Sequence, residues 1–135
     1  MSDVSHILIT LFMILHAIGA HYAYAEVPLG FWLKDALDLS RNHSDRIVHF
    51  CFGLLIAYPI REVFLRVANA RRFWAYYLPL DVTLAFSGFY EIIESMVTEL
   101  ANPELGAAYL RAQGDQWDDQ KDMALAALGV LLLLR

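Results

Sequence analysis

Apolar residues along the chain form four long runs that are separated by polar segments. A helix of about 20 apolar residues crosses the hydrocarbon core of a bilayer, which is roughly 30 Å thick. We therefore expect four helices, at residues 4–25, 44–65, 73–97 and 119–134. Because helices satisfy their backbone hydrogen bonds within lipid, the pattern predicts an all-α, polytopic integral membrane protein whose residues 1–135 form one domain, a four-transmembrane-helix bundle.

The individual runs differ in their polar content. The run 4–25 contains no Asp, Glu, Lys or Arg. A signal peptide would explain it less well, because the basic segment that begins such peptides is missing and the charged residue near its start is Asp3. The run 73–97 contains Asp81, Glu91 and Glu94, and the run 119–134 is short.

Composition supports the membrane assignment and excludes other classes. The chain is 59% hydrophobic, with a mean hydropathy of +0.44, whereas soluble proteins are about half apolar. Its formal net charge is -5 and it has no basic stripe, which argues against nucleic acid as a partner. The single cysteine, Cys51, excludes an intrachain disulfide and a zinc site built on several cysteines.

Arginines predict the orientation of the bundle. The segment between the second and third runs contains Arg66, Arg71 and Arg72, so the positive-inside rule places it in the cytoplasm. Both chain ends are then cytoplasmic. The other two connections, 26–43 and 98–118, face outward and contain aromatic residues typical of the membrane interface, among them Phe31, Trp32 and Trp117.

Most of the unusual polar residues fall at the outer ends of these helices. Within single helices they are spaced three or four residues apart, which puts each pair on one helix face. They are His21, Asp45, His49, Glu91, Glu94, Asp118 and Asp122. The sequence therefore predicts a polar site at the outer end of the bundle, to which every helix contributes.

Helix capping is the alternative explanation for some of these residues. Asn42, Ser44 or Asp118 would serve as helix caps, and Asp45 would favour a helix N-terminus. Capping does not explain His49 or Glu91, because both sit inside their helices. Because isolated ionisable groups are costly in hydrocarbon, such groups usually pair, bind a metal or line a wet cavity.

The residue types suggest three roles within such a site. The candidates for acid–base catalysis are Asp45, His49, Glu91 and Glu94. Imidazole and carboxylate ligands suit a divalent Zn, Mn or Fe ion, and the candidate ligands are His21, His49, Glu91, Asp118 and Asp122. Arginine binds phosphate well, and the candidate substrate-binding residues are Arg41, Arg46, His43, Asp115 and Trp117. Acids that hold a cation and arginines that hold a phosphate would together fit a lipid phosphate head group.

Several ordered motifs resemble a known family. The segments HYAYAEVPLGFWLKDALDLSRNHSDRIVHF, REVFLR, FSGFYEIIES and QGDQWDDQKDMALAALG resemble the YjdF-like bacterial inner-membrane proteins, a domain of unknown function, from about His16 to Gly129. The SDRIVHF segment also resembles VanZ-like proteins, which are associated with glycopeptide resistance. The YjdF-like pattern is matched by His21, Tyr24, Pro28, Arg41, Asn42, His43, Asp45, Arg46, His49, Arg61, Glu62, Tyr90, Glu91, Glu94, Gly114, Asp115, Trp117, Asp118, Gln120, Asp122 and Met123.

The resemblance implies a location but no established reaction. It implies a multi-pass protein of the bacterial inner (plasma) membrane. Two departures bear on the site: typical members begin with additional transmembrane helices, and Ser95 stands where tryptophan is usual. The first departure leaves open whether this chain alone closes the pocket, and the second opens space beside Glu94.

Three classes of function fit the predicted site, and the sequence does not decide whether the protein is an enzyme. The first is a membrane-embedded, metal-dependent enzyme that acts on a lipid-linked or amphipathic substrate at the outer leaflet. The second is a protein that binds or transports a cation or small molecule. The third is a structural membrane module whose polar layer fixes the helix register. Membrane lipids are the expected partners, and the short last run also fits a homo-oligomer in which a neighbouring copy completes the bundle.

Overall fold

The structure, a computed structural model, describes residues 1–101 and 117–135, and all regular structure in these ranges is helical. The helices are α1 (Asp3–His21), α2 (Pro28–Ala36), α3 (Ser44–Arg66), α4 (Trp74–Ala101) and α6 (Asp118–Leu133). The all-α class is therefore confirmed. Each of the four predicted runs corresponds to a long helix, although α1 ends earlier and α4 ends later than predicted.

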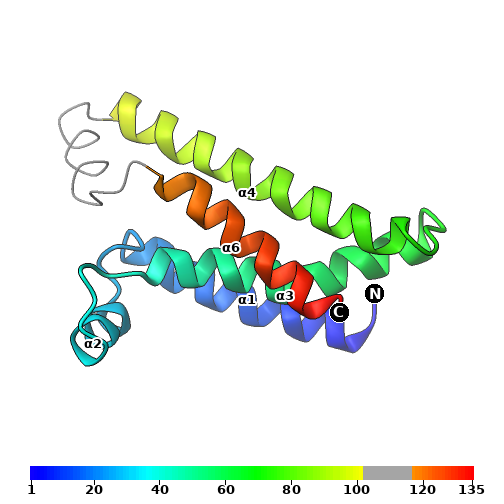
Figure 1. The fold of residues 1–135 in the computed structure, drawn as a ribbon, viewed down its shortest axis with the longest axis horizontal. Coiled ribbons are helices and arrows are strands. Elements are labelled where there is room, and N and C mark those ends of the chain that lie inside the picture. The colour runs from blue at the N-terminus through cyan, green and yellow to red at the C-terminus, as the bar shows by residue number, and fades with distance from the viewer. Residues whose placement is uncertain (102–116) are drawn as a thin grey trace.

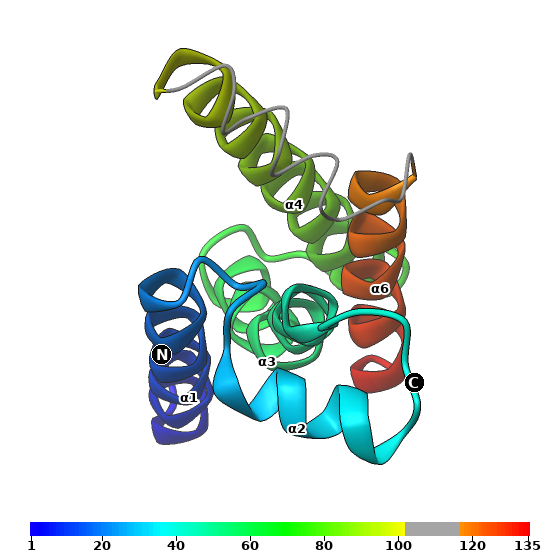
Figure 2. The ribbon, with the colours of Figure 1, turned by 90° about the vertical axis from the view of Figure 1, so that its left-hand side faces the viewer.

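Helix α3 lies at the centre of the molecule. It packs against α1, α4 and α6, and α4 also packs against α6. The four long helices run roughly along the long axis of the molecule (Figure 1), and both chain ends lie at the same end as the turn between α3 and α4. Helix α2 lies at the opposite end, where it crosses below the bundle between α1 and α6 (Figure 2). That end therefore collects the end of α1 and the starts of α3 and α6.

Small residues let α3 and α6 approach backbone to backbone. A Cβ atom added to Gly53 of α3 would lie 1.8 Å from the backbone oxygen of Ala126. One added to Gly129 of α6 would lie 2.4 Å from the backbone oxygen of Phe50. Ala57 and Ala126 are fully buried in the same region. Close approach over small residues is typical of helix pairs in membranes, and it fixes how α6 presents its first turns to α3.

Helix α1 ends at His21, four residues before the predicted end at residue 25. Ala23 and Tyr24 take up left-handed backbone conformations, with φ of 45° and 54°, and the Tyr24 amide donates to the Gly19 carbonyl at 2.7 Å. The Tyr24 ring then lies directly over Gly19, where a Cβ atom would come within 2.5 Å of the ring. This reversal buries Tyr24 against the bundle.

Helix α2 was predicted as part of a connection, not as a helix. It begins with Pro28 in its first turn, a position that proline favours, and with nine residues it is too short to span a membrane. Asn42 holds it against α3. The Asn42 amide nitrogen donates to the Val27 carbonyl at 3.0 Å, and its amide oxygen accepts from the Ser44 amide at 3.0 Å. Gly30 packs so closely on Asn42 that a Cβ atom would lie 1.9 Å from that oxygen.

Two of the described helices, α1 and α3, are long and apolar enough to cross a membrane. Helix α4 is longer but contains several acidic residues, and α6 has 16 residues, fewer than the roughly 20 that a span needs. Many large apolar side chains are exposed on the outer faces of α1 and α4, among them Ile7, Leu11, Ile14, Ile18, Phe86, Phe89, Ile92 and Met96. Soluble monomers rarely expose apolar surface in continuous patches, so these faces suit contact with lipid.

At the end that holds the chain termini, Glu62 joins α3 to the start of α1. Its Oε2 atom accepts hydrogen bonds from the backbone nitrogen and the hydroxyl of Ser2, each at 2.9 Å, and from the Ser5 hydroxyl. Its Oε1 atom pairs with Arg66 at 2.7 Å. These contacts account for a buried carboxylate near the end of α3, so Glu62 has a structural role.

Candidate functional site

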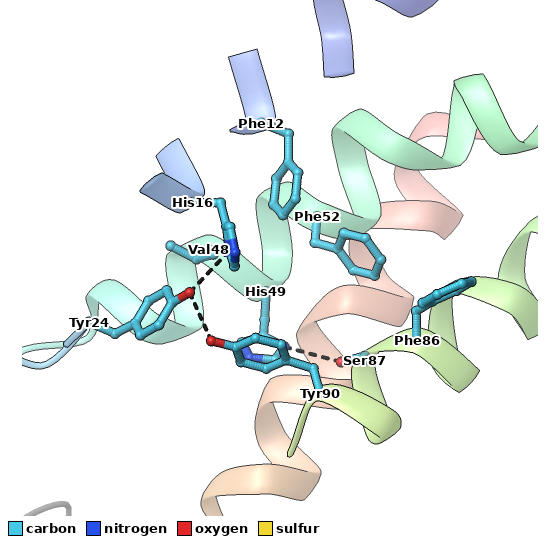
Figure 3. A pocket seen from close by; sticks show the side chains of 9 residues that line it. All are labelled: Phe12, His16, Tyr24, Val48, His49, Phe52, Phe86, Ser87 and Tyr90. Carbon is cyan, nitrogen blue, oxygen red and sulfur yellow. Dashed lines mark hydrogen bonds between the residues drawn. The ribbon is translucent and has the colours of Figure 1, made fainter. Parts of the chain in front are cut away.

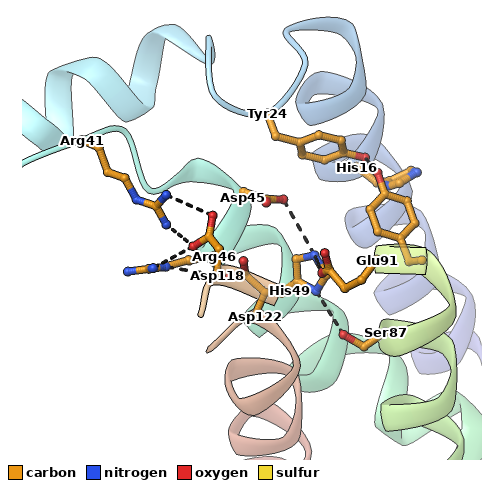
Figure 4. A network of polar contacts seen from close by, with 11 residues as sticks. His16, Tyr24, Arg41, Asp45, Arg46, His49, Ser87, Glu91, Asp118 and Asp122 are labelled. Carbon is orange, nitrogen blue, oxygen red and sulfur yellow. Dashed lines mark hydrogen bonds and ion pairs between the residues drawn. The ribbon is translucent and has the colours of Figure 1, made fainter. Parts of the chain in front are cut away.

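Polar side chains from α3, α4 and α6 converge at the end of the molecule where α2 lies (Figure 4). His49 of α3 is at their centre. Its Nε2 atom lies 3.0 Å from Glu91 Oε1 and its Nδ1 atom lies 3.1 Å from Ser87 Oγ, both on α4. The three side chains are almost completely buried, with exposed fractions of 5% for His49, 8% for Glu91 and 2% for Ser87.

The partners of His49 define the roles of its two nitrogens. An ionised carboxylate only accepts hydrogen bonds, so Glu91 favours the tautomer whose proton is on Nε2. In that neutral tautomer Nδ1 carries a lone pair, and the Ser87 hydroxyl donates to it. Glu91 therefore orients the ring, and the free lone pair of His49 is directed at a hydroxyl.

Two further carboxylates flank this group. Asp45 Oδ1 lies 3.8 Å from His49 Nε2, and Asp122 Oδ1 lies 3.9 Å from Arg46 Nε. Neither oxygen accepts a hydrogen bond within the described ranges, and the exposed fraction of Asp122 is 2%. A buried carboxylate oxygen without a hydrogen bond is costly, so these atoms are available to a proton or a bound ligand.

Two arginines meet a single carboxylate at the edge of the cluster. Arg41 Nη1 donates to Asp118 Oδ2 at 3.0 Å, and Arg46 Nη2 donates to Asp118 Oδ1 at 2.8 Å. Burial raises the pKa of the Asp118 carboxyl, but the hydrogen bonds from Arg41 and Arg46 outweigh burial and hold that pKa below its ordinary value. An anionic ligand at these arginines would have to compete with Asp118.

A cavity of about 150 Å³ lies beside His49, between α1, α3 and α4 (Figure 3). Most of its wall is apolar or aromatic, and its polar groups are gathered around His49. It is lined by Phe12, His16, Tyr24, Val48, His49, Phe52, Phe86, Ser87 and Tyr90. The Tyr90 hydroxyl donates to the Tyr24 hydroxyl at 2.8 Å, which in turn lies 3.0 Å from His16 Nδ1. The open surface of the cavity is thus almost entirely apolar, and His49 and Ser87 are among the few polar residues that border it.

The structure brings together most of the residues that the sequence singled out. Asp45, His49, Glu91, Asp118, Asp122, Arg41 and Arg46 all belong to the network drawn in Figure 4. Glu94 is half-buried one helical turn beyond Glu91, and His43 is half-buried directly before α3.

Two predicted site residues, His21 and Trp117, lie elsewhere. His21 is exposed at the end of α1, where its ring meets the edge of Tyr22 with ring centroids 4.8 Å apart. The reversal that follows His21 directs Tyr24, not His21, toward the cluster. Trp117 is 61% exposed before α6. Asp115 is outside the described residues.

The predicted metal ligands do not form one group. Among the described residues, no set of three or more His, Cys, Asp and Glu side chains is arranged to hold a metal ion. His21 is remote, Glu91 is taken up by His49, and Asp118 is taken up by the two arginines. The binding of a divalent metal therefore stays a prediction from the sequence, and the described residues form no cluster of ligands for it.

Sequence reasoning missed several residues that line the cavity. Ser87 is uncharged and was not considered, although it is four residues before Glu91 and hence on the same face of α4. Tyr24 and Tyr90 matched the family pattern without a role. His16 had no assigned role, and its partner Tyr24 could be identified only from the turn after α1.

Comparisons with known proteins agree with a membrane location. The family model described as "Predicted membrane protein (DUF2238)" matches residues 1–135. The chain is 42% identical over 125 residues to the inner membrane protein YjdF of Escherichia coli strain K12, an alignment that covers 92% of this chain. The chain spans 59% of the length of that relative. No solved structure matches, and the resemblance to VanZ-like proteins finds no support in these comparisons.

Proposed function

The chain belongs to the DUF2238 family of predicted membrane proteins, and from that premise we propose that it is a membrane-embedded enzyme that acts on a lipid-linked or amphipathic molecule. In this proposal the apolar part of the substrate enters the cavity between α1, α3 and α4. The reacting group lies against His49, which acts as the general acid or base. The inner-membrane relative supports a bacterial inner membrane as the location.

The observation that carries the proposal is the position of His49 in the cavity wall. One of its nitrogens is paired with Glu91 and the other is directed at the hydroxyl of Ser87, a residue that lines the cavity. A general base has to be within hydrogen-bond reach of the proton that it removes, and a second group usually orients it. A buried titratable group in an apolar pocket is a common mark of a functional site.

The size of the cavity indicates what part of a ligand it accepts. At about 150 Å³ it is smaller than the roughly 300–1,000 Å³ of sites that enclose a whole drug-sized molecule. Phe86, which lines it, is 60% exposed, so the cavity reaches the outer surface of α4. A substrate with a long apolar chain would leave most of that chain in the surrounding lipid and insert only the reacting region.

The proposal includes a four-span topology. Helix α4 would cross with Glu91, Ser87 and Thr83 turned toward the bundle, where they are buried. Helix α6 would extend about 24 Å at 1.5 Å per residue, so it would require a thinner bilayer or a tilt of its neighbours. Arg61, Arg66, Arg71 and Arg72 would keep the α3–α4 turn and both termini in the cytoplasm. The site would then lie near the outer leaflet.

A second candidate function, the binding or transport of a cation or a proton, is favoured by the charge balance of the cluster. Among the residues labelled in Figure 4, carboxyl groups outnumber guanidinium groups, since Asp45, Glu91, Asp118 and Asp122 are accompanied by Arg41 and Arg46. The unbonded oxygens of Asp45 and Asp122 would be the first ligands of such a cation.

A paired substitution tests the enzyme proposal in cells that contain only the variant protein. We expect His49→Gln to change the lipid profile, measured by mass spectrometry, in the same way as loss of the whole protein. His21→Ala is the matched control, because His21 is exposed outside the cluster, and its lipid profile should equal that of the wild type. A wild-type profile for His49→Gln, with the variant present in the membrane at normal amounts, would contradict the proposal.

Measurements on the purified protein distinguish the enzyme proposal from a cation-binding or metal-binding function. If a cation or a divalent metal is the ligand, the thermal stability of the protein rises with its concentration, and Asp122→Asn abolishes that rise. The enzyme proposal in its metal-free form predicts no such dependence, and metal analysis should find no stoichiometric ion. A chelator-sensitive ion in stoichiometric amount would instead support the metal-dependent form that the sequence suggested.

A further inference from the structure

We propose that Ser87 is a nucleophile that attacks the carboxylic ester of a lipid and carries its acyl group as a covalent intermediate. This inference rests on the proposed function and names its reaction. Ser87, His49 and Glu91 form an uninterrupted series, with Ser87 Oγ 3.1 Å from His49 Nδ1 and His49 Nε2 3.0 Å from Glu91 Oε1. A nucleophile, a base within hydrogen-bond reach and a group that orients the base together define an activated hydroxyl.

The helix geometry of α4 explains how the series forms. Ser87 and Glu91 are four residues apart, so both lie on the face of α4 that packs against α3. The imidazole of His49 reaches between them, one nitrogen to each (Figure 4). The pair on α4 therefore fixes the plane of the ring without a contribution from any loop.

Ser87 borders the cavity although the residue is only 2% exposed. It forms part of the wall of the cavity, together with the rings of Phe52, Phe86 and Tyr90 (Figure 3). A serine that only satisfied the hydrogen-bonding needs of His49 would not have to border an empty, lipid-facing space. An ester group that entered from the lipid side would meet Ser87 among apolar rings.

The proposed step balances with water as the second reactant. Ser87 Oγ bonds to the ester carbonyl carbon and gives its proton to His49 Nδ1, and Glu91 stabilises the imidazolium that forms. The bond from that carbon to the leaving oxygen then breaks, and His49 Nδ1 returns the proton to the departing alcohol. Water gives a proton to the same nitrogen and bonds to the acyl carbon. The bond from that carbon to Ser87 Oγ then breaks, and His49 Nδ1 returns the proton to Ser87 Oγ, so the acyl group leaves as a carboxylic acid.

A covalent probe tests this inference directly. The full chain is purified in lipid nanodiscs and treated with a long-chain alkyl fluorophosphonate, which reacts with activated serines, and the modified residue is identified by mass spectrometry. We expect modification of Ser87, none in Ser87→Ala, and a rate about 100-fold lower in His49→Gln, because general-base catalysis contributes about that much. Ser95→Ala, two turns further along α4, is the matched control and should react like the wild type.

The wild-type result is decisive even if a variant fails to fold, because the modified residue is mapped on the unaltered chain. No modification, or modification at a residue other than Ser87, overturns the inference. A photoreactive lipid added to the same sample distinguishes the two proposals. If this lipid crosslinks to the cavity while the fluorophosphonate does not react, Ser87 is not the nucleophile but the proposed lipid site stands. If neither reagent reaches the cavity, both proposals fail.

Discussion

At the residue scale, the Asp118 carboxylate pairs with two residues that are distant from it in the sequence. It accepts hydrogen bonds from Arg41 and Arg46, which are 77 and 72 positions away. The side chains of the three residues are 14–21% exposed, so loss of the carboxylate would leave two partly buried cations without this acceptor. The start of α6 is thereby tied to the start of α3.

We predict that Asp118→Asn lowers the free energy of unfolding by about 1–3 kcal/mol, the usual cost when a partly buried charged group loses its partner. Thermal unfolding in detergent at neutral pH measures the change. The neighbouring Asp119→Asn serves as the control and should stay within about 0.5 kcal/mol of the wild type, because Asp119 forms neither of these arginine contacts. Equal effects of the two substitutions would contradict the importance of the arginine pair.

The effect of Asp118→Asn on stability should depend on pH. The pKa of Asp118 is lowered in the folded state, so its contribution to stability is present above the unfolded value of 3.8 and is lost as the pH falls through the lower, folded pKa. We therefore expect the stability difference between the wild type and Asp118→Asn to shrink as the pH is lowered below 3.8. A difference that stays constant over this range would show that it does not arise from the ionised carboxylate.

The sequence predicted part of the site at this scale. Spacing placed His49 and Glu91 on inward faces because charged side chains in apolar runs are conspicuous. Ser87 was missed because a neutral hydroxyl in such a run carries no comparable signal. Tyr24 was missed, and His21 was expected at the cluster but is exposed outside it, because the left-handed turn at Ala23 and Tyr24 follows no pattern of apolar spacing.

At the scale of elements, the contact between α3 and α6 depends on the absence of side chains at two positions. Gly53 and Gly129 bring the two backbones together, and Asp122 and Asp118 enter the cluster from the same helix, α6. Any substitution that separates the helices should therefore reduce both the stability of the fold and the function of the site.

We predict that Gly53→Ala destabilises the protein by about 1–3 kcal/mol, the typical cost of overpacking, because the new methyl group would meet the backbone of Ala126. Gly129→Ala should destabilise the protein by a similar amount, because its methyl group would meet the backbone of Phe50. The matched control is Gly88→Ala in α4, where the methyl group would meet only the flexible end of Met123 at 3.2 Å. Thermal unfolding in nanodiscs measures all three, and equal melting temperatures would refute the proposed contact.

The long helices were predictable because each coincides with a long, mostly apolar run of the sequence. Their starts at Ser44, Trp74 and Asp118 lie within one residue of the predicted 44, 73 and 119. Helix α2 was not predictable in this way. Its apolar stretch is too short to indicate a span, and its position depends on Asn42, which reaches back 15 residues to Val27.

At the scale of the whole molecule, the polar cluster and the positively charged turn lie at opposite ends (Figure 1). If the turn between α3 and α4 is cytoplasmic, α2 and the cluster lie at the outer surface. The exposed side chains of this region, Leu29, Trp32 and Leu37, would then lie at the outward-facing interface of the same membrane, because tryptophan is enriched at membrane interfaces.

Cysteine labelling in intact cells tests this orientation. In a Cys51→Ala background, we predict that Trp117→Cys reacts with a membrane-impermeant thiol reagent, whereas Arg71→Cys, in the exposed α3–α4 turn, reacts only after the membrane is opened. The reverse pattern would place the site in the cytoplasm.

The most direct test of the central claim is to map where a photoreactive lipid crosslinks to the wild-type protein in nanodiscs. The account predicts crosslinks to Phe12, Phe52 and Tyr90, which line the cavity beside His49, and competition by an unlabelled amphipathic ester. Crosslinks confined to the outer faces of α1 and α4, such as Ile7 and Phe89, without any in the cavity would contradict it.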